Sequence, residues 1–290
     1  MLFQAAYQTY LAAVLLAQLP ERGQAWLRAQ LASPAPEKDV LLAFSLAPRL
    51  VGKEPLALTA AQLHQAQELR PGFDPSGWTT AQAARTLLLL RAAHLEEAAY
   101  IELLNQLFGT AATTEQAALY ASLPLLPYPE AHTKRAAEGV RTAMTNVFDA
   151  IALGNPYPHD YLTQGAWNQL VLKAVFNARP LYRIYGLDNR RNKPLARMLL
   201  DYAHERWAAG RTLTPEVWRL VGPYLTPESL PDAHRLLLSA NTLEVRAGKL
   251  ALAACGLPEA RFLLAQVAAT PAPDTRPYTW QLIGEQAYAA

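Results

Sequence analysis

Helix start signals recur along this chain, whereas strand signals are almost absent. Thr59, Thr79 and Thr113 are each followed three residues later by a glutamine, which is the capping-box spacing that begins a helix. Thr214 and Thr226 each precede a Pro-Glu pair, so that a cap, a proline and an acid fall where a first helical turn accepts them. Alternating β-branched runs and Asn-Gly or Asp-Gly hairpin turns do not occur. The sequence therefore predicts an all-α fold.

Apolar residues recur at helical spacing over most of the chain. The spacing predicts helices near 2–18, 21–31, 38–50, 59–69, 79–107 (either straight or bent), 114–122, 131–153, 163–178, 194–209, 214–224, 230–239, 241–254 and 258–268. From residue 194 onward the predicted helices are short and their links are very short. This pattern favours irregular antiparallel helical hairpins, an α-solenoid of HEAT type, in the C-terminal half.

A proline cluster, SLPLLPYPE at 122–130, marks the best candidate boundary. Ala, Leu and Gln dominate before it, whereas charged residues, Asn, Tyr and Trp concentrate after it. We therefore expect an N-terminal helical subdomain at 1–121 and a C-terminal helical subdomain at 122–268 that holds the polar residues. A proline-punctuated tail at 269–290 is expected to dock on the body.

Composition excludes several classes of protein. Hydrophobic residues make up 51% and charged residues 17%, so a filled core is expected rather than disorder. A net charge of +2 is too weak for general nucleic-acid binding, and the single Cys255 excludes a disulfide framework or a Cys-rich zinc site. No apolar run reaches the ~18 to 20 residues that cross a bilayer. We expect a soluble cytoplasmic protein that meets membranes only through partners, if at all.

Unusual polar residues gather between 138 and 211. Glu138, Thr145 and Asp149 fall on one stripe of the predicted helix 131–153, and Asn146 is adjacent. This stripe is either a solvated face or the polar wall of a pocket. After Gly154, the prolines of NPYPHDY are explained by a rigid elbow between two packed helices.

The helix expected after the elbow carries Asn168 and Lys173 within an apolar run. A single lysine on a polar stripe is usually solvent-facing, and the alternative for Lys173 is a Schiff-base or anion-binding role. Arg183 belongs to a cluster of arginines with tyrosine neighbours. Such a cluster is either a basic loop or a site for a phosphate or carboxylate, because guanidinium groups bind these oxyanions in bidentate fashion.

The predicted helix 194–209 places Arg197, Asp201, His204 and Glu205 on one stripe. Asp201 and His204 have the spacing of metal ligands on a helix, but the H-E-x-x-H pattern fails because residue 208 is alanine. The alternative is a buried ion-pair network that bridges helices. We therefore assign no metal and no cofactor.

Residues that simple packing explains least are predicted to form one ligand-binding pocket, with no catalytic residue assigned. The predicted set is Asn146, Asp149, Asn155, Asn168, Lys173, Arg183, Asp201, His204, Glu205 and Arg206.

Three long phrases carry a family resemblance: RTAMTNVFDAIALGNPYPHDYL, AWNQLVLKAVFNARPLYRIYGLD and LARMLLDYAHERWAAGRTLTPEVWRLVGPYL. Over roughly residues 120–225 the chain resembles the EboA-type proteins. The resemblance implies a bacterial protein, encoded in a metabolic and export-associated gene cluster, that takes part in metabolite traffic. Companions in such clusters resemble a UbiA-like prenyltransferase, a sugar-phosphate cyclase, a TatD-like hydrolase and TIM-barrel proteins. The resemblance implies no catalytic residue.

Together these observations favour a helical-repeat binding protein of a bacterial secondary-metabolite biosynthesis or traffic cluster. Its predicted partners are a small metabolite, or other proteins of the cluster, bound in a polar pocket. One alternative is an enzyme, metal-dependent in one version, that uses Asp149, Lys173, Asp201, His204 and Glu205. The other is a scaffold for pathway proteins, which would show a large apolar surface patch.

Overall fold

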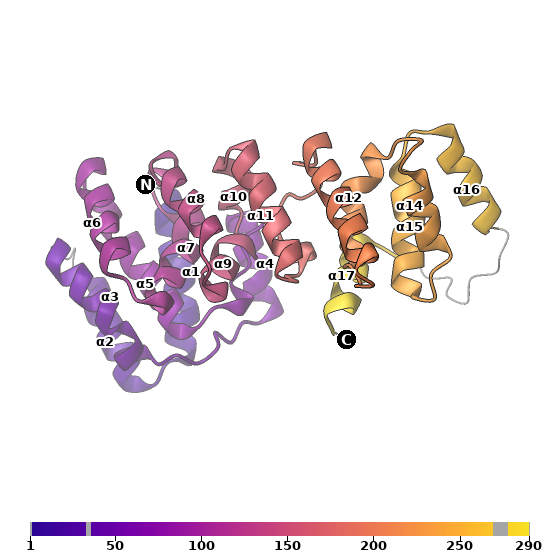
Figure 1. Cartoon of the computed structure of the whole chain (residues 1–290). Helices are drawn as coiled ribbons and strands as arrows, with labels where there is room; N and C mark the ends of the chain where they lie inside the picture. The colour runs from indigo at the N-terminus through magenta and orange to yellow at the C-terminus, as the bar shows by residue number, and fades with distance from the viewer. Residues whose placement is uncertain (1, 33–35, 269–277, 290) are drawn as a thin grey trace. The chain divides into compact units, whose positions relative to one another are not determined.

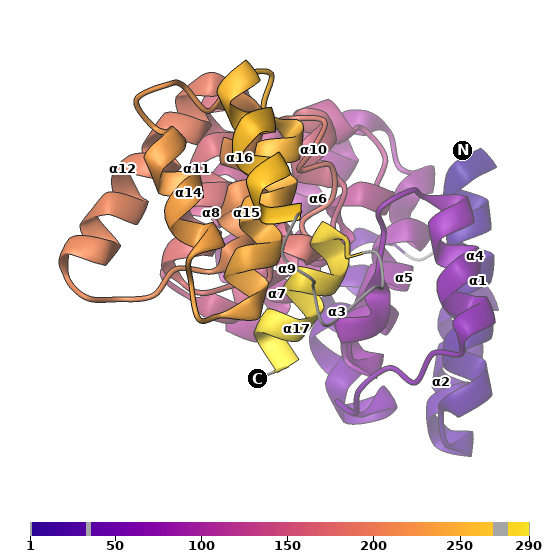
Figure 2. The same cartoon turned by 90° about the vertical axis from the view of Figure 1, so that its right-hand side faces the viewer.

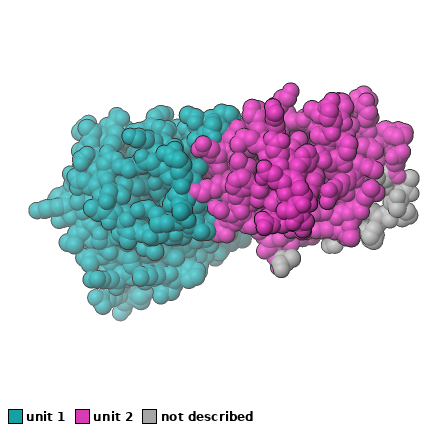
Figure 3. Space-filling model, viewed as in Figure 1, with its two compact units in different colours: residues 1–167 teal, residues 168–290 magenta. Residues whose placement is uncertain are grey.

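The computed structural model describes residues 2–32, 36–268 and 278–289, and these residues are organised as helices and their connections (Figure 1). Within these ranges there is no strand, and a single isolated bridge joins Pro55 and Thr79. The chain divides into two compact units, residues 1–167 and 168–290, which are coloured separately in Figure 3. The predicted all-α class is confirmed.

Unit 1 is built around one largely buried helix, α5 (Thr80–Arg91). Its α-helices are α1 (Leu2–Gln18), α2 (Glu21–Ala32), α3 (Glu37–Val51), α4 (Ala60–Leu69), α5 (Thr80–Arg91), α6 (Glu97–Thr110), α7 (Thr113–Ser122), α8 (Thr133–Arg141), α9 (Thr145–Ala152) and α10 (Tyr157–Tyr161). Short 3-10 turns are η1 (Pro75–Gly77), η2 (Ala92–His94), η3 (Leu123–Leu125) and η4 (Pro129–His132). Helix α5 packs against α1, α3 and α7, and Figure 2 shows α4 beside α1. A helix that is apolar on every side belongs in a core, which explains the run TLLLLR in α5.

A charged residue lies inside that core. Arg85 of α5 is 3% exposed. Its Nε donates to the carbonyl of Phe44 (3.0 Å), its guanidinium lies 5.0 Å above the Phe44 ring, and its Nη2 donates to Glu115 Oε1 (2.9 Å). Burial lowers the pKa of Arg85, and the Glu115 carboxylate opposes this effect. Buried charges are tolerated when they are paired in this way.

Unit 2 is organised around α15. Helix α11 (Gln164–Phe176) begins at the end of unit 1 and continues into unit 2. The other elements are η5 (Leu181–Arg183), α12 (Lys193–Ala208), η6 (Pro215–Val217), α13 (Trp218–Val221), η7 (Gly222–Tyr224), α14 (Leu230–Leu237), α15 (Thr242–Ala254), α16 (Pro258–Ala268) and α17 (Trp280–Ala289). Helix α15 packs against α13, α14, α16 and α17, and Figures 1 and 2 show α14 and α15 side by side. Antiparallel packing of consecutive helices is present, whereas a HEAT-type solenoid stays a prediction.

Two long predicted helices are interrupted, and those predictions were wrong. The predicted helix 79–107 is broken after Arg91 by η2. The predicted helix 131–153 is broken between α8 and α9, where the Thr142 hydroxyl accepts a hydrogen bond from the Met144 N–H (3.2 Å). Threonine competes with helical hydrogen bonding in this way. Glu138 and Asp149 therefore lie on different helices, and the predicted single stripe does not exist.

The capping predictions were partly correct. Thr59 and Thr79 form complete capping boxes with Gln62 and Gln82. The box predicted at Thr113 was wrong, because Thr113 is already helical and the Glu115 carboxylate accepts from the preceding Ala112 N–H (3.0 Å).

The other two predicted starts lack the expected side-chain cap. Thr214 precedes η6 and makes no capping hydrogen bond. Thr226 is followed by a turn, and α14 begins only at Leu230. Thr226 is therefore not the residue that caps this helix.

The boundary between the two compact units falls between Trp167 and Asn168. The predicted subdomains 1–121 and 122–268 stay a prediction. Of the predicted docked tail, residues 269–277 and 290 lie outside the described residues. Its described part forms α17, which packs against η5, η6 and α15. None of the helices in the described ranges combines the length and apolar content needed to span a bilayer.

Candidate functional site

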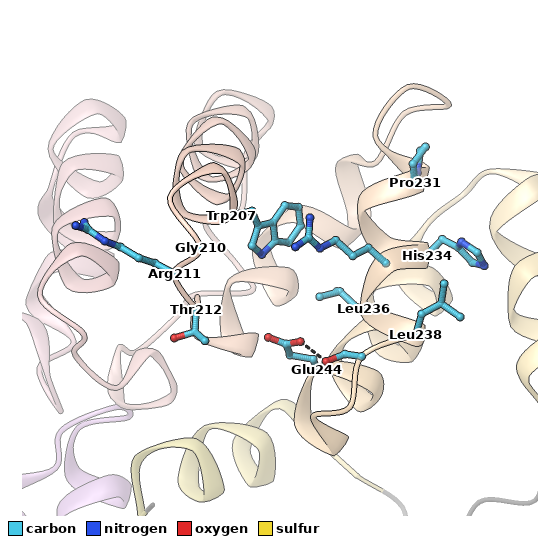
Figure 4. A pocket seen from close by; sticks show the side chains of 11 residues that line it. Trp207, Gly210, Arg211, Thr212, Pro231, His234, Leu236, Leu238 and Glu244 are labelled. Carbon is cyan, nitrogen blue, oxygen red and sulfur yellow. Dashed lines mark hydrogen bonds between the residues drawn. The ribbon is translucent and has the colours of Figure 1, made fainter.

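Unit 2 contains a cavity of about 630 Å³ between the end of α12 and the facing parts of α14 and α15 (Figure 4). This volume lies in the range of sites for small molecules. The lining residues are Trp207, Gly210, Arg211, Thr212, Pro231, His234, Arg235, Leu236, Leu238, Ser239 and Glu244.

The loop after α12 forms one edge of the cavity and is held by a predicted site residue. Gly210 has φ +66°, a left-handed conformation that glycine adopts without strain at a helix end. Arg206 then donates from Nε (3.0 Å) and Nη2 (2.8 Å) to the carbonyl of Thr212. Arg206 therefore fixes the backbone of the loop through two of its N–H donors.

Trp207 supplies the aromatic wall of the cavity. Its indole stacks on that of the buried Trp218, with ring centroids 5.8 Å apart and planes 15° from parallel. The guanidinium carbon of Arg235, from α14, lies 4.4 Å from the centre of the Trp207 ring. A cation at this distance from an indole face is attracted to it, so this contact orients the exposed Arg235 side chain.

Glu244, in the first turn of α15, supplies the acidic side of the cavity. Its Oε2 accepts a hydrogen bond from the Ser239 hydroxyl (2.5 Å), and the Ser239 oxygen accepts one from the Asn241 N–H (3.1 Å). These contacts fix the direction of the carboxylate. Figure 4 shows Trp207 and Glu244 on different sides of the cavity, with Leu236 between them, and shows Arg211 and His234 pointing away from Trp207. The cavity thus combines one oriented cation, one oriented anion and an apolar surface.

His204 lies beside this cavity rather than with the neighbours predicted for it. Its Nε2 is 2.8 Å from Asp232 Oδ2 of α14, and its ring centroid is 5.9 Å from that of Trp207. Asp201 and Glu205 of the same helix are exposed, as is Arg197. The alternative of a buried ion-pair network among these four residues was therefore wrong. In the part of the chain that the structure describes, no three His, Cys, Asp or Glu side chains are close enough to hold a metal ion.

Three other predicted residues of unit 2 lie elsewhere. Asn168 (α11) is 8% exposed and forms a reciprocal amide pair with Asn192, with N–O distances of 3.2 and 2.9 Å. Asn192 in turn caps α12 by accepting from the Leu195 N–H (3.0 Å), so that the pair joins α11 to the start of α12. Lys173 and Arg183 are partly exposed, and burial lowers the pKa of Lys173.

Three predicted residues belong to unit 1. Asn146 is exposed on α9, and Asp149 is partly exposed on the same helix. Asn155 is 3% exposed and bonds only backbone groups: its Nδ2 donates to Tyr120 O (3.0 Å) and Ala150 O (2.9 Å), and its Oδ1 accepts from Tyr157 N (3.0 Å). These bonds assign a structural role to the side chain. Convergence of unit 1 residues with those of unit 2 stays a prediction.

The polar residues of NPYPHDY fix the start of a short helix, α10. The Asp160 carboxylate contacts both Arg70 (Oδ2 to Nη2, 2.5 Å) and His159 (Oδ1 to Nδ1, 2.7 Å). The Tyr157 hydroxyl donates a hydrogen bond to the Pro129 carbonyl (2.5 Å). Gly154, with φ +60°, leaves 2.6 Å between an added Cβ and the Asp74 carbonyl, so a side chain there would be strained. The predicted elbow between helices thus contains a helix of its own.

Sequence reasoning missed the residues that build the cavity: Trp207, Arg235, Ser239 and Glu244. A tryptophan at the end of a charged helix was one available signal. The contact between Trp207 and Arg235 joins two helices across 28 positions of chain, and no local pattern marks it.

A family model described as metabolite traffic protein EboA matches residues 7–222. Neither the curated proteins nor the solved structures contain a match to the chain. The match includes Trp207, Gly210, Arg211 and Thr212 of the cavity and ends before α14 and α15. Since it covers well over half of the sequence, the chain belongs to the EboA family of metabolite traffic proteins.

Proposed function

We propose that this protein binds a small metabolite during its traffic, and that the cavity between α12, α14 and α15 is the binding site. The observation that carries the proposal is the oriented guanidinium of Arg235 on the wall of a cavity of about 630 Å³. The side chain of Arg235 makes no hydrogen bond or ion pair with any other described residue. A cation held in place without a polar partner is available to a ligand.

The arrangement fits binding because its polar groups are fixed before a ligand arrives. Arg206 holds the loop at Thr212, Ser239 holds Glu244, and Trp207 holds Arg235. Preorganised groups lose little entropy on binding and so favour affinity. The bacterial origin, the cytoplasmic location and the place in secondary metabolism expected from the sequence belong to the same proposal.

Equilibrium dialysis tests the proposal. The purified full chain is dialysed against a small-molecule extract of the cells that encode it, and retained compounds are identified by mass spectrometry. We expect one compound, or a small related group, to be enriched and recovered unchanged. Recovery of a chemically converted compound would instead favour the enzymatic alternative.

Two arginine variants make the test specific for the cavity. Arg235→Ala removes the oriented cation, whereas Arg261→Ala removes the same charge from an exposed position of α16 that does not line the cavity. A charge-assisted hydrogen bond contributes roughly 1.5 to 3 kcal/mol, so retention by Arg235→Ala should fall at least about tenfold. Arg261→Ala should behave like the wild type. The proposal fails if nothing is retained, or if both variants retain as much as the wild type.

A second candidate function, docking of a partner protein, is favoured by an exposed apolar group on α11 and α12. Phe176 is 53% and Met198 36% exposed, and the ring of Phe176 lies 4.4 Å from that of Tyr202. Co-elution of the wild type, and not of Phe176→Ser, with a protein encoded beside it would support this candidate.

A further inference from the structure

The two charged groups of the cavity differ in what they can accept from a ligand. The guanidinium carbon of Arg235 lies 4.4 Å from the centre of the Trp207 ring, and its N–H donors make no hydrogen bond to another described residue. Planar donors of this kind fit the two oxygens of a carboxylate or a phosphate. An oxyanion therefore complements this side of the cavity.

Glu244 imposes the opposite requirement. One of its oxygens already accepts from Ser239 (2.5 Å), and an ionised carboxylate accepts but does not donate hydrogen bonds. A ligand group at the remaining oxygen must donate a hydrogen bond, as a hydroxyl or an amine does. A second anionic group there would be repelled.

The apolar lining limits the rest of the ligand. Trp207 and Leu236 line the same cavity, and Figure 4 shows Leu236 between Trp207 and Glu244. Contact with these two side chains favours carbon over further charge. Leu238, which is 75% exposed, continues the apolar surface at the cavity.

We propose that the cavity selects an organic oxyanion that also carries a hydroxyl or amino donor, with the oxyanion on Arg235 and the donor on Glu244. This inference rests on the proposed function and specifies its ligand class. It also assigns the selection of the ligand to α14 and α15, which lie outside the span matched by the family model.

Matched pairs of compounds test the inference on the full chain. Glycerol 1-phosphate is compared with propyl phosphate, and glycerate with propionate, so that the members of each pair differ only in their hydroxyl groups. Glycerol serves as the compound without an oxyanion. Binding is measured by NMR titration, read at the indole N–H resonance of Trp207.

The hydroxylated member of at least one pair should bind about tenfold more tightly than its partner, which corresponds to about 1.4 kcal/mol. Arg235→Ala should weaken its binding at least about tenfold, and Arg261→Ala should leave it unchanged. Glu244→Gln should reduce the preference for the hydroxylated member and improve binding of propyl phosphate.

Three results would overturn the inference: no compound perturbs Trp207, glycerol binds as well as the anions, or Glu244→Gln leaves the preference intact. Dialysis separates this failure from failure of the proposed function. If an extract compound is retained through Arg235 but lacks an oxyanion or a donor, the metabolite-binding function stands and the assigned ligand class is wrong.

Discussion

Gly284 of α17 lies directly against Glu216 of η6, and a Cβ added to Gly284 would stand 2.6 Å from Glu216 Oε1. The same Cβ would stand 2.6 Å from Tyr182 Cδ1. Beside this contact, Ile283 is fully buried and the Tyr288 hydroxyl donates to the Arg179 carbonyl (2.5 Å). The approach of α17 to the rest of unit 2 therefore depends on the absence of a side chain at one position.

Gly284→Ala should loosen α17. Overpacking at such a contact costs about 1 to 3 kcal/mol, so the urea midpoint should fall and the amides of α17 should exchange faster with solvent. Gly109→Ala is the matched control, since Gly109 is also helical and has no atom within 4 Å of an added Cβ. That substitution should be neutral or stabilising by up to about 1 kcal/mol. Equal effects of the two substitutions would contradict the close contact.

Glu216 should make unit 2 more stable in acid than in mild base. The side chain is fully buried, its Oε2 accepts from the Leu181 N–H (3.0 Å), and its Oε1 has no partner among the described residues. Burial raises the pKa of Glu216 to about 7, although the nearby Arg219 charge opposes the shift.

The folded protein therefore binds more protons than the unfolded chain between the ordinary pKa of 4.5 and about 7. The contribution of protonated Glu216 to the free energy of unfolding is complete below pH 4.5 and is lost as the pH rises to about 7. The total loss is on the order of 3 kcal/mol.

Glu216→Gln checks this, because the amide stays neutral at every pH. Denaturation curves at pH 5 and pH 8 should show that the free energy of unfolding of the variant, relative to that of the wild type, increases as the pH rises. Glu259→Gln, at an exposed position of α16, serves as control and should follow the wild type. The same pH dependence in Glu216→Gln and the wild type would refute the assignment to Glu216.

Glu115→Gln should destabilise unit 1 strongly, because it leaves the guanidinium of Arg85 buried without its opposing charge. Removing one member of a buried ion pair costs about 3 to 5 kcal/mol. The comparison is Glu138→Gln, which breaks the half-exposed pair between Glu138 and Arg135 (3.0 Å) and should cost less than about 1 kcal/mol. Urea denaturation measures both. If both substitutions lowered the free energy of unfolding by similar amounts, burial would not explain the strength of the pair between Arg85 and Glu115.

Asn155→Asp should cost more than Asn155→Ala at neutral pH. The alanine variant leaves the carbonyls of Tyr120 and Ala150 without the donor they share, at about 1 to 3 kcal/mol. The aspartate variant adds a buried negative charge that faces the same two oxygens. Lowering the pH should narrow the difference, because the introduced carboxyl group can donate a hydrogen bond once it is protonated. An aspartate variant as stable as the wild type at neutral pH would show that Asn155 is not needed as a donor.

The all-α class could be predicted because its signals are local. The capping boxes at Thr59 and Thr79 and the apolar spacing of 2–18 and 258–268 depend on neighbouring residues only. The break between α8 and α9 could not be predicted from spacing, since the apolar period continues across Thr142 while its hydroxyl bonds the local backbone.

The candidate site was harder to predict because its contacts are between distant helices. Glu216 fitted the pattern of an acid at a helix start, yet α17 covers it and makes it a buried carboxyl. His204 was correctly singled out as unusual, but its partner is Asp232 rather than a residue of its own helix. Residue type alone therefore does not determine which side chains meet, because tertiary packing does.

The stack of Trp207 on Trp218 gives the cavity a built-in optical reporter. Two indoles with nearly parallel planes lie 5.8 Å apart, so that the outer indole has a fixed aromatic neighbour. An oxyanion bound to Arg235 would change the electric field on the outer indole while the inner one stays buried. Occupancy can thus be followed in the unlabelled protein, at the wavelengths where tryptophan absorbs.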